Sequence, residues 1–204
     1  MILMDLYKAL KECLAVRYTQ VDNSGDYAVK QEGDTLKIFF EWSDEAEDWE
    51  NNFKFFAVPW KPYKDMKAPW LCHRGFLKVW KSIEPHLAQY IENPDIRRVE
   101  IVGYSHGAAI ALLCYEYCVF NRPYIEVEGV GFGCPRVFWG IVPKSVKERF
   151  KNFKVIRNGR DIVTHVPPAL FGFRHVGEVV KIGQTSPVID HFDSEYLKHL
   201  QELN

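Results

Sequence analysis

The chain carries one serine in a sequence context that suits a nucleophile. Ser105 lies between Gly103 and Gly107, so these residues match the pattern G-x-S-x-G. An apolar, β-branched run precedes the pattern and an alanine-rich segment follows it, which predicts a strand, a sharp turn and a helix. In such a turn the serine side chain stands clear of the backbone, and the first N–H groups of the helix point to where an oxyanion would form. The simpler alternative is an ordinary turn between strand and helix with an exposed serine.

A serine hydroxyl needs a base that takes its proton and an acid that orients the base. In α/β-hydrolases the chain order is nucleophile, acid, base, and the acid lies in a loop just past a downstream strand. Residues 154–161 supply an apolar strand, a polar turn with a glycine, and Asp161. Asp161 is therefore the candidate acid, and a turn or cap residue is its alternative role.

Four histidines follow the candidate acid in the chain: His165, His175, His191 and His199. His165 follows Asp161 too closely to face it easily across a site, and His199 lies in a helical stretch where a surface position is the simplest interpretation. His175 precedes an apolar strand and suits a structural role. His191 lies in a loop after that strand and before the last helix, where this fold places the base. The spacing favours His191.

The surrounding pattern predicts an α/β sheet that is parallel in the second half of the chain, because strands and helices alternate there. The proline-rich, aromatic stretch from Pro59 to Trp70 is not expected to form a regular element. The predicted helices cover about residues 1–21, 75–91 (with Pro85 inside), 106 onward, 145–150 and 194–203, and the predicted strands cover 27–30, 35–40, part of 51–58, 98–104, 125–132, 153–157 and 178–182.

Bulk composition indicates one globular domain over residues 1–204. Hydrophobic residues make up 47% and charged residues 26% of the chain, which is ordinary for a folded protein. The net charge of −1 gives no reason to expect a nucleic-acid partner. No cysteine, histidine or carboxylate spacing suggests a metal, and no glycine-rich loop suggests a phosphate, so we expect no cofactor.

The cysteines and the N-terminal residues favour a cytoplasmic location. The five cysteines are an odd number without metal-site spacing, which predicts free thiols in a reducing compartment. The first residues lack the pattern of a signal peptide. No apolar run approaches the roughly 20 residues that a membrane-spanning helix needs.

Several segments, in order, resemble the class 3 lipase family of α/β-hydrolases, which includes the fungal-type triacylglycerol lipases. The resemblance runs from about residue 35 to the end of the chain. It implies an α/β-hydrolase-like fold with a central, mostly parallel sheet flanked by helices. The matching segments are 38–43 with 48–49 (the family's F-R-G-T/S segment and its D-W sequel), 73–76 (H-x-G-F), 103–107 (G-x-S-x-G), 131–137 (F-G-x-P-R-V), 157–168 (N-x-x-D-x-V-P-x-x-P-P), 172–179 (G-Y-x-H-x-G-x-E-V), and 190–196 (the triad histidine).

By this resemblance Ser105 is the nucleophile, Asp161 the acid and His191 the base. Ser43 would donate to the oxyanion, together with the backbone N–H of His106. The sequence departs from the family in one place: Glu41-Trp42 stands where the family usually has Arg-Gly. The oxyanion loop therefore carries a bulky residue and a reversed charge.

The resemblance also implies a lid at about residues 58–71, covering the site until a lipid surface draws it open. Lysines alternate with aromatic side chains there, which suits a flap with an apolar underside and a cationic rim. We therefore expect transient contact with a lipid surface. Packing of these aromatic side chains on the edge of the sheet is the alternative to a lid. For Phe171 and Phe173, a core position is the alternative to contact with substrate. The predicted substrate-contacting residues are Trp42, Trp60, Trp70, Phe171 and Phe173.

Together these features predict a serine hydrolase that cleaves carboxylic esters of lipids or of short acyl chains through an acyl-enzyme. Two alternatives remain open from the sequence. The first is a phospholipase A1 or lysophospholipase, which the same triad could serve. The second is a non-catalytic lipid-binding protein on a hydrolase fold, which the Glu41-Trp42 departure would favour.

Overall fold

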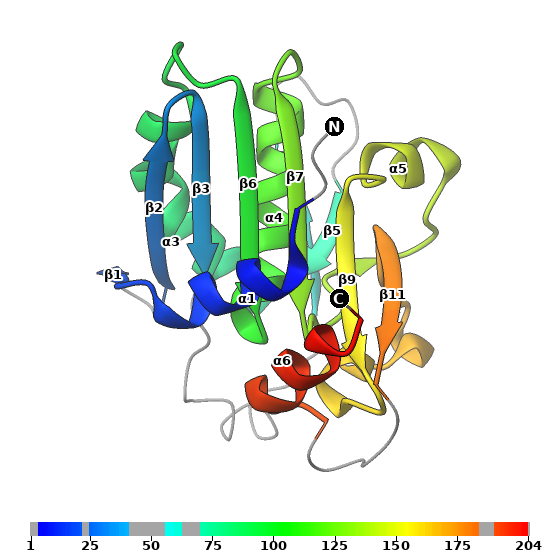
Figure 1. Cartoon of the computed structure of the whole chain (residues 1–204). Helices are drawn as coiled ribbons and strands as arrows, with labels where there is room; N and C mark the ends of the chain where they lie inside the picture. Colours follow the sequence, from blue (N-terminus) through cyan, green and yellow to red (C-terminus); the bar gives the residue numbers. More distant parts are fainter. Residues whose placement is uncertain (1–3, 22–24, 41–55, 63–69, 184–189, 204) are drawn as a thin grey trace.

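A computed structural model describes residues 4–21, 25–40, 56–62, 70–183 and 190–203 (Figure 1). Its centre is a seven-stranded sheet with the strand order β1-β2-β3-β6-β7-β9-β11. The strands are β1 (Thr19–Val21), β2 (Gly25–Glu32), β3 (Thr35–Phe40), β6 (Arg98–Tyr104), β7 (Glu126–Phe132), β9 (Phe153–Asn158) and β11 (Glu178–Ile182).

The five strands from β3 to β11 run parallel, and β1 and β2 add an antiparallel edge. Parallel strands bury both faces, so they are built from nearly continuous apolar runs. In β6, for example, Val99 and every residue from Ile101 to Tyr104 are buried. The mostly parallel α/β-hydrolase-like sheet predicted from the sequence is confirmed, and it brings the carboxyl ends of these strands to one edge.

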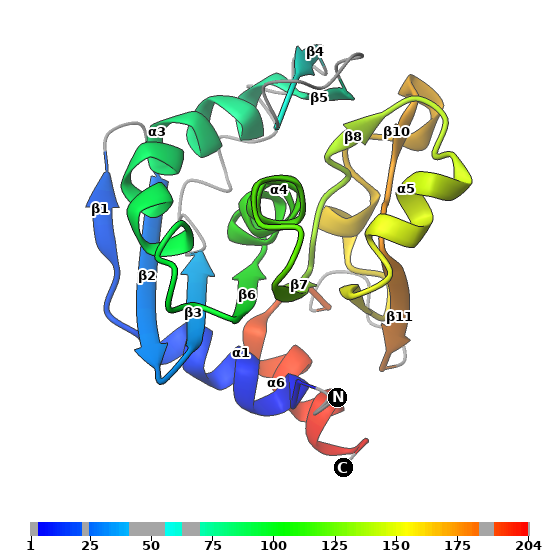
Figure 2. The same ribbon diagram turned by 90° about the horizontal axis from the view of Figure 1, so that it is seen from above.

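Helices cover both faces of this sheet, as Figure 2 shows from above. Helices α3 (Arg74–Ile91) and α4 (His106–Asn121) pack on one face, and α1 (Leu6–Ala15) and α6 (Asp193–Gln201) pack on the other. The short helix α5 (Lys144–Arg149) lies beside the β9–β11 end. None of the helices in the described part of the chain is long and apolar enough to cross a membrane.

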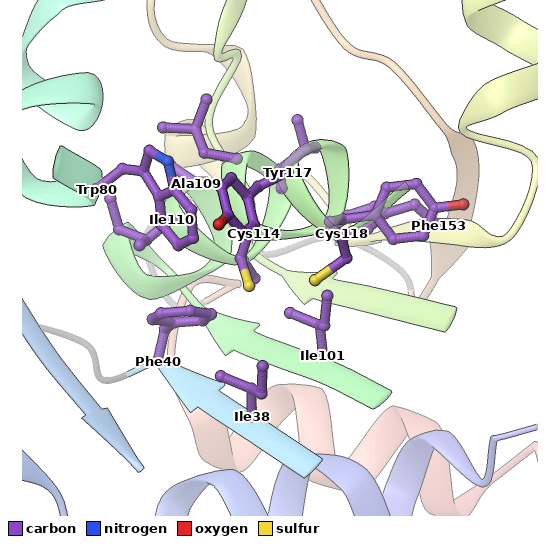
Figure 3. Close-up of a cluster of buried hydrophobic side chains, with 14 of the residues drawn as sticks. Ile38, Phe40, Trp80, Ile101, Ala109, Ile110, Cys114, Tyr117, Cys118 and Phe153 are labelled. Atoms are coloured by element: carbon purple, nitrogen blue, oxygen red, sulfur yellow. The ribbon is translucent and has the colours of Figure 1, made fainter. Parts of the chain in front are cut away.

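Helix α4 is the centre of the larger hydrophobic core. Every residue from Gly107 to Cys118 is buried, so the helix has no solvent-facing side over three turns. Figure 3 shows Cys114 and Cys118 pointing from α4 toward the sheet, above Ile38 and Ile101. Helix α3 continues through Pro85 and presents an apolar stripe to this core. The strand before the serine and the helix after it are therefore held from all sides.

A second, four-stranded sheet has the order β10-β8-β5-β4. It corrects the expectation that residues 59–70 contain no regular element, because β4 (Ala57–Trp60) pairs with β5 (Trp70–His73). Pro59 is tolerated because β4 is the edge strand, where a missing N–H breaks no ladder bond. The other two strands are β8 (Phe138–Trp139) and β10 (Phe173–Arg174).

The N-terminal region is the other clear difference from expectation. The predicted helix over residues 1–21 is shorter, because α1 ends at Ala15 and β1 follows. Val16 has extended backbone angles, and the residues around it include β-branched side chains that suit a strand. Asp5 caps the helix by accepting the N–H of Lys8 at 3.0 Å. The strand expected within residues 51–58 lies mostly outside the described residues.

Candidate active site

Ser105 occupies the turn between β6 and α4 in a strained backbone conformation. Its φ of 54° is the only positive value among the described residues other than glycine. The Ser105 N–H donates to the carbonyl oxygen of Phe132 at 2.8 Å, which fixes the turn against β7. A Cβ on Gly103 would lie 2.3 Å from the carbonyl oxygen of Gly107, so only glycine fits where strand and helix cross. The strand, turn and helix predicted around Ser105 are all present.

Two hydrogen bonds connect Ser105, His191 and Asp161 in series. The Ser105 Oγ lies 2.9 Å from His191 Nε2. On the other side of the ring, His191 Nδ1 lies 2.8 Å from Asp161 Oδ2. A carboxylate can only accept, so Nδ1 carries the proton and Nε2 is left to accept the serine hydroxyl. The structure therefore brings together the three residues that the sequence predicted.

The Asp161 carboxylate is buried and receives two further hydrogen bonds. Its Oδ1 accepts the backbone N–H of Val163 at 2.8 Å, and its Oδ2 accepts the hydroxyl of Tyr196 at 2.6 Å. Burial, followed by the nearby Asp161 charge, raises the pKa of Tyr196 well above its usual value, so the phenol keeps its proton and donates. These donors stabilise the charged carboxylate and fix its direction.

His191 is held through its ring and through its backbone. The ring stacks on Tyr104 with the centroids 5.4 Å apart, and the Tyr104 hydroxyl donates to the His191 carbonyl oxygen. One residue earlier, the carbonyl oxygen of Asp190 accepts the side-chain amide of buried Asn158 at 3.0 Å. A Cβ on Gly133 would lie 3.0 Å from both the Asp161 carboxylate and the His191 ring, so a glycine there leaves room for the pair.

The other three histidines make contacts outside the serine relay. His165 Nδ1 lies 3.0 Å from the backbone oxygen of Asp161, and His175 Nε2 lies 2.8 Å from the carbonyl oxygen of Thr164. His199 is not a simple surface residue, because its Nδ1 lies 2.7 Å from Asn158 Oδ1 and so supports the loop before His191. Among the four candidates, His191 is the one that contacts Ser105.

Of the two predicted oxyanion donors, His106 lies within the described residues and Ser43 does not. His106 is the first residue of α4, where the backbone N–H groups point beyond the end of the helix. Its side chain packs against Phe76 with the ring centroids 5.5 Å apart. Burial and the neighbouring His73 lower the pKa of His106 to about 4, so the ring is neutral near pH 7. Ser43 and Trp42 lie outside the described residues.

The predicted substrate-contacting residues fall in two places. Trp60 is buried and stacks on Phe138, and Trp70 meets the same ring edge-on. Phe173 is buried with its ring 5.8 Å from that of His73. Phe171 is 54% exposed and lies just before β10. The lid segment expected at about 58–71 begins and ends in the paired strands β4 and β5, and residues 63–69 lie outside the described part of the chain.

Other residues support the site without having been assigned a role from the sequence. The Phe76 ring packs between those of His73 and His106, at the start of α4, and only the H-x-G-F pattern indicated these residues in advance. Tyr104 stands inside the G-x-S-x-G pattern, but no local feature showed that it would contact His191. Within the described part of the chain, no three histidine, cysteine or acidic side chains gather in a way that could hold a metal ion.

Comparison with known proteins gives the family. The family model described as Lipase (class 3) matches residues 38–171. This chain belongs to the class 3 lipases. A lipase of Rhizomucor miehei is 30% identical over 166 residues, which cover 75% of this chain and 43% of that protein. A secreted mono- and diacylglycerol lipase of Malassezia globosa is 32% identical over 98 residues, which cover 46% of this chain and 31% of that protein. This class 3 lipase thus spans less than half the length of these two relatives.

The solved structure of Rhizomucor miehei triacylglyceride lipase superposes on the chain with a TM-score of 0.63. The match covers 81% of this chain and 66% of that one, at 24% sequence identity. At this identity the likeness shows a shared fold.

The expectation of a cytoplasmic protein is contradicted, because the Malassezia globosa relative is named as secreted. The cysteine argument behind that expectation fails for a physical reason. All five cysteines are free and buried, so the core shields each thiol from oxidants in any compartment. An odd number of buried thiols therefore does not report the redox state of the surroundings.

Proposed function

We propose that this class 3 lipase is a serine hydrolase that cleaves carboxylic esters of lipids or of short acyl chains. The observation that carries the proposal is the unbroken relay from Ser105 Oγ through His191 to Asp161, with contacts of 2.9 and 2.8 Å. Both distances lie within hydrogen-bond reach, which the transfer of a proton between these groups requires. The names of its relatives, lipase and mono- and diacylglycerol lipase, support an ester of glycerol as the substrate.

The geometry leads to a two-step mechanism. His191 Nε2 takes the hydroxyl proton as Ser105 Oγ attacks the acyl carbonyl carbon. Asp161 keeps the imidazole in the required tautomer and stabilises the charge that develops on it. The backbone N–H of His106 donates to the oxyanion, with Ser43 as the expected second donor. The alcohol leaves with the proton held by His191, and a water molecule activated by the same histidine then releases the acid from Ser105.

The test is hydrolysis of p-nitrophenyl esters from acetyl to palmitoyl by the wild type and by Ser105→Ala. The variant should lose at least about 10⁴-fold in kcat because no nucleophile remains. Ser194→Ala is the matched control, because Ser194 is exposed on α6 and should leave turnover unchanged. The chain length with the highest kcat/KM would then give the size of the acyl site.

Labelling by a fluorophosphonate tests the serine without assuming a substrate. Only an activated serine reacts, so the wild type should be labelled and Ser105→Ala should not. A folded protein that neither turns over esters nor reacts with the probe would refute the proposal and favour the non-catalytic lipid-binding alternative. Labelling without turnover on simple esters would instead direct the search to phospholipids.

A further inference from the structure

A groove of about 1130 Å³ lies away from the serine, between β8, α5, β10 and β11. Figure 2 shows these four elements on one side of the molecule. Its apolar wall is formed mainly by Trp139, Ile141 and Val142. None of the three residues of the serine relay lines it. The relay is nevertheless nearby, because His175 in the groove wall contacts Thr164, which belongs to the short helix that follows Asp161.

Large apolar side chains stand exposed along the rim of this groove. Ile141 is 93% exposed, and Leu170 is 91% exposed on the adjoining segment. A hydrogen bond joins the segment that carries Ile141 to the segment that carries Leu170, because Trp139 Nε1 donates to the carbonyl oxygen of Phe171 at 2.7 Å. The Trp139 ring also covers Gly172, where an added Cβ would lie 2.4 Å from it. Exposed large apolar side chains gathered at one place mark a surface that binds something.

The polar side of the groove is positively charged. Lys147, Lys151 and Arg174 line it and are exposed, and they face a single acidic lining residue, Glu178. On α5, Arg149 forms an ion pair with Glu116. The three cations that line the groove form no ion pair with an acidic residue in the described part of the chain. His175 adds no charge near pH 7, since burial lowers its pKa to about 4. The groove therefore carries an excess of positive charge beside an apolar rim.

We propose that this groove and its rim form a docking surface for a lipid bilayer that contains anionic phospholipid. Exposed isoleucine, leucine and tryptophan side chains suit the boundary between headgroups and acyl chains, and lysine and arginine beside them attract anionic headgroups. A second copy of the chain fits less well, because a symmetric pairing would bring two cationic grooves together. The inference rests on the proposed function in one respect: docking would bring an enzyme that cleaves lipid esters to the bilayer that holds its substrate.

The experiment measures vesicle binding in the Ser105→Ala background, so that no hydrolysis alters the membrane. Vesicles are made of phosphatidylcholine alone or of equal parts of phosphatidylcholine and phosphatidylglycerol. Binding should be at least about tenfold tighter to the anionic vesicles and should weaken as salt is added. Replacing both Lys147 and Lys151 by glutamine should weaken that binding about 25-fold, at about fivefold per cation.

Two further variants separate charge from apolar contact. Lys8→Gln with Lys11→Gln is the matched control, because it removes the same charge from exposed positions on α1 and should change binding less than twofold. Ile141→Ser should weaken binding to both kinds of vesicle, by about fivefold or more, because it removes apolar area from the contact. Circular dichroism and thermal unfolding establish that each variant is folded.

Three results would overturn the docking surface. The first is equal binding of the groove and control variants, and the second is no binding to either vesicle. The third is a dimer in sedimentation that Ile141→Ser dissociates, which would assign the surface to a second copy. Turnover of p-nitrophenyl acetate by the same variants with Ser105 restored is the independent readout. Vesicle binding by a folded protein that neither turns over esters nor reacts with the fluorophosphonate would refute the proposed function alone, and turnover without vesicle binding would refute the docking surface alone.

Discussion

The serine and its two partners are held in place by different forces. Ser105 is fixed by backbone packing: its turn is hydrogen-bonded to β7, and the helix behind it is buried from Gly107 to Cys118. Asp161 and His191 are fixed by side-chain hydrogen bonds and ring stacking from Tyr104, Tyr196 and neighbouring polar groups. The serine side of the site, around Ser105, therefore depends on close packing. The acid–base side, around Asp161 and His191, depends on a polar network.

This difference predicts how each side responds to change. Close packing leaves no room for even one added carbon, so a small substitution on the serine side should disturb the fold itself. A network spreads the orientation of one group over several hydrogen bonds, each of which contributes about 1 kcal/mol. Loss of one bond on the acid–base side should therefore reduce the rate in steps while the fold remains.

The largest expected effect is that of Asp161→Asn. The amide has nearly the same shape, so the variant should fold, but it no longer holds His191 in the tautomer that accepts the serine proton. We expect kcat to fall about 10⁴-fold, which corresponds to about 5.5 kcal/mol. The measurement is ester turnover beside thermal unfolding, with Asp95→Asn on an exposed loop as the control. Activity within tenfold of the wild type would show that Asp161 is not the acid.

Gly103→Ala should have the next largest effect, and it should act on stability. The added carbon would lie 2.3 Å from the backbone oxygen of Gly107, which cannot move without shifting α4. We expect the free energy of unfolding to fall by about 3 kcal/mol or more. Gly33→Ala is the control for added volume: Gly33 has a positive φ, which Gly103 does not, but no atom lies within 4 Å of the new carbon, so the cost should be only the backbone strain of about 1 kcal/mol. Similar losses in a denaturant titration would remove the packing argument.

The same difference explains what the sequence could and could not predict. The strand, turn and helix around Ser105 are contiguous in the chain, so the pattern of apolar residues and glycines was enough to predict them. Tyr196 contacts Asp161 across 35 positions, and Tyr104 contacts His191 across 87. Such pairs leave no periodic signal in one sequence. The choice of Asp161 and His191 therefore came from chain order and family resemblance, and their supporting tyrosines were missed.

The aromatic stretch at residues 58–71 shows a second limit of the sequence. Its prolines argued against regular structure, but the position of a strand within its sheet decides whether a proline is tolerated, and that position is a tertiary property. Trp60 and Trp70 pack on Phe138 in the second sheet. Their role in substrate binding stays a prediction, as do those of Trp42 and Ser43, which lie outside the described residues.

A third prediction concerns acid pH and the serine side of the site. Burial lowers the pKa of His73 to about 4 in the folded protein, whereas an unfolded histidine titrates near pH 6.5. The unfolded chain therefore binds a proton first, so this contribution to stability is complete above pH 6.5 and is lost as the pH falls toward 4. At pH 5 the loss should be about 2 kcal/mol for this histidine.

Denaturant unfolding from pH 8 to pH 4.5 measures this loss, in the wild type and in His73→Phe. The variant has no proton to gain at that position, so its stability should fall less steeply with acid. His175→Gln should reduce the acid-dependent loss of stability by a similar amount, because burial also lowers the pKa of His175 to about 4. Identical pH profiles for all three proteins would show that neither histidine is kept neutral by the fold.

The smallest expected effect, and the sharpest test of the network, is that of Tyr196→Phe. It removes one of the donors to Asp161 and leaves the ring in place against Tyr104. We expect kcat to fall about tenfold with KM nearly unchanged, since the loss of one hydrogen bond to a charged group is worth about 1.5 kcal/mol. Tyr124→Phe, on a ring that is 98% exposed, is the control. A drop in stability with kcat unchanged would mean that Tyr196 only fills space, and the acid–base side would then be held by packing like the serine side.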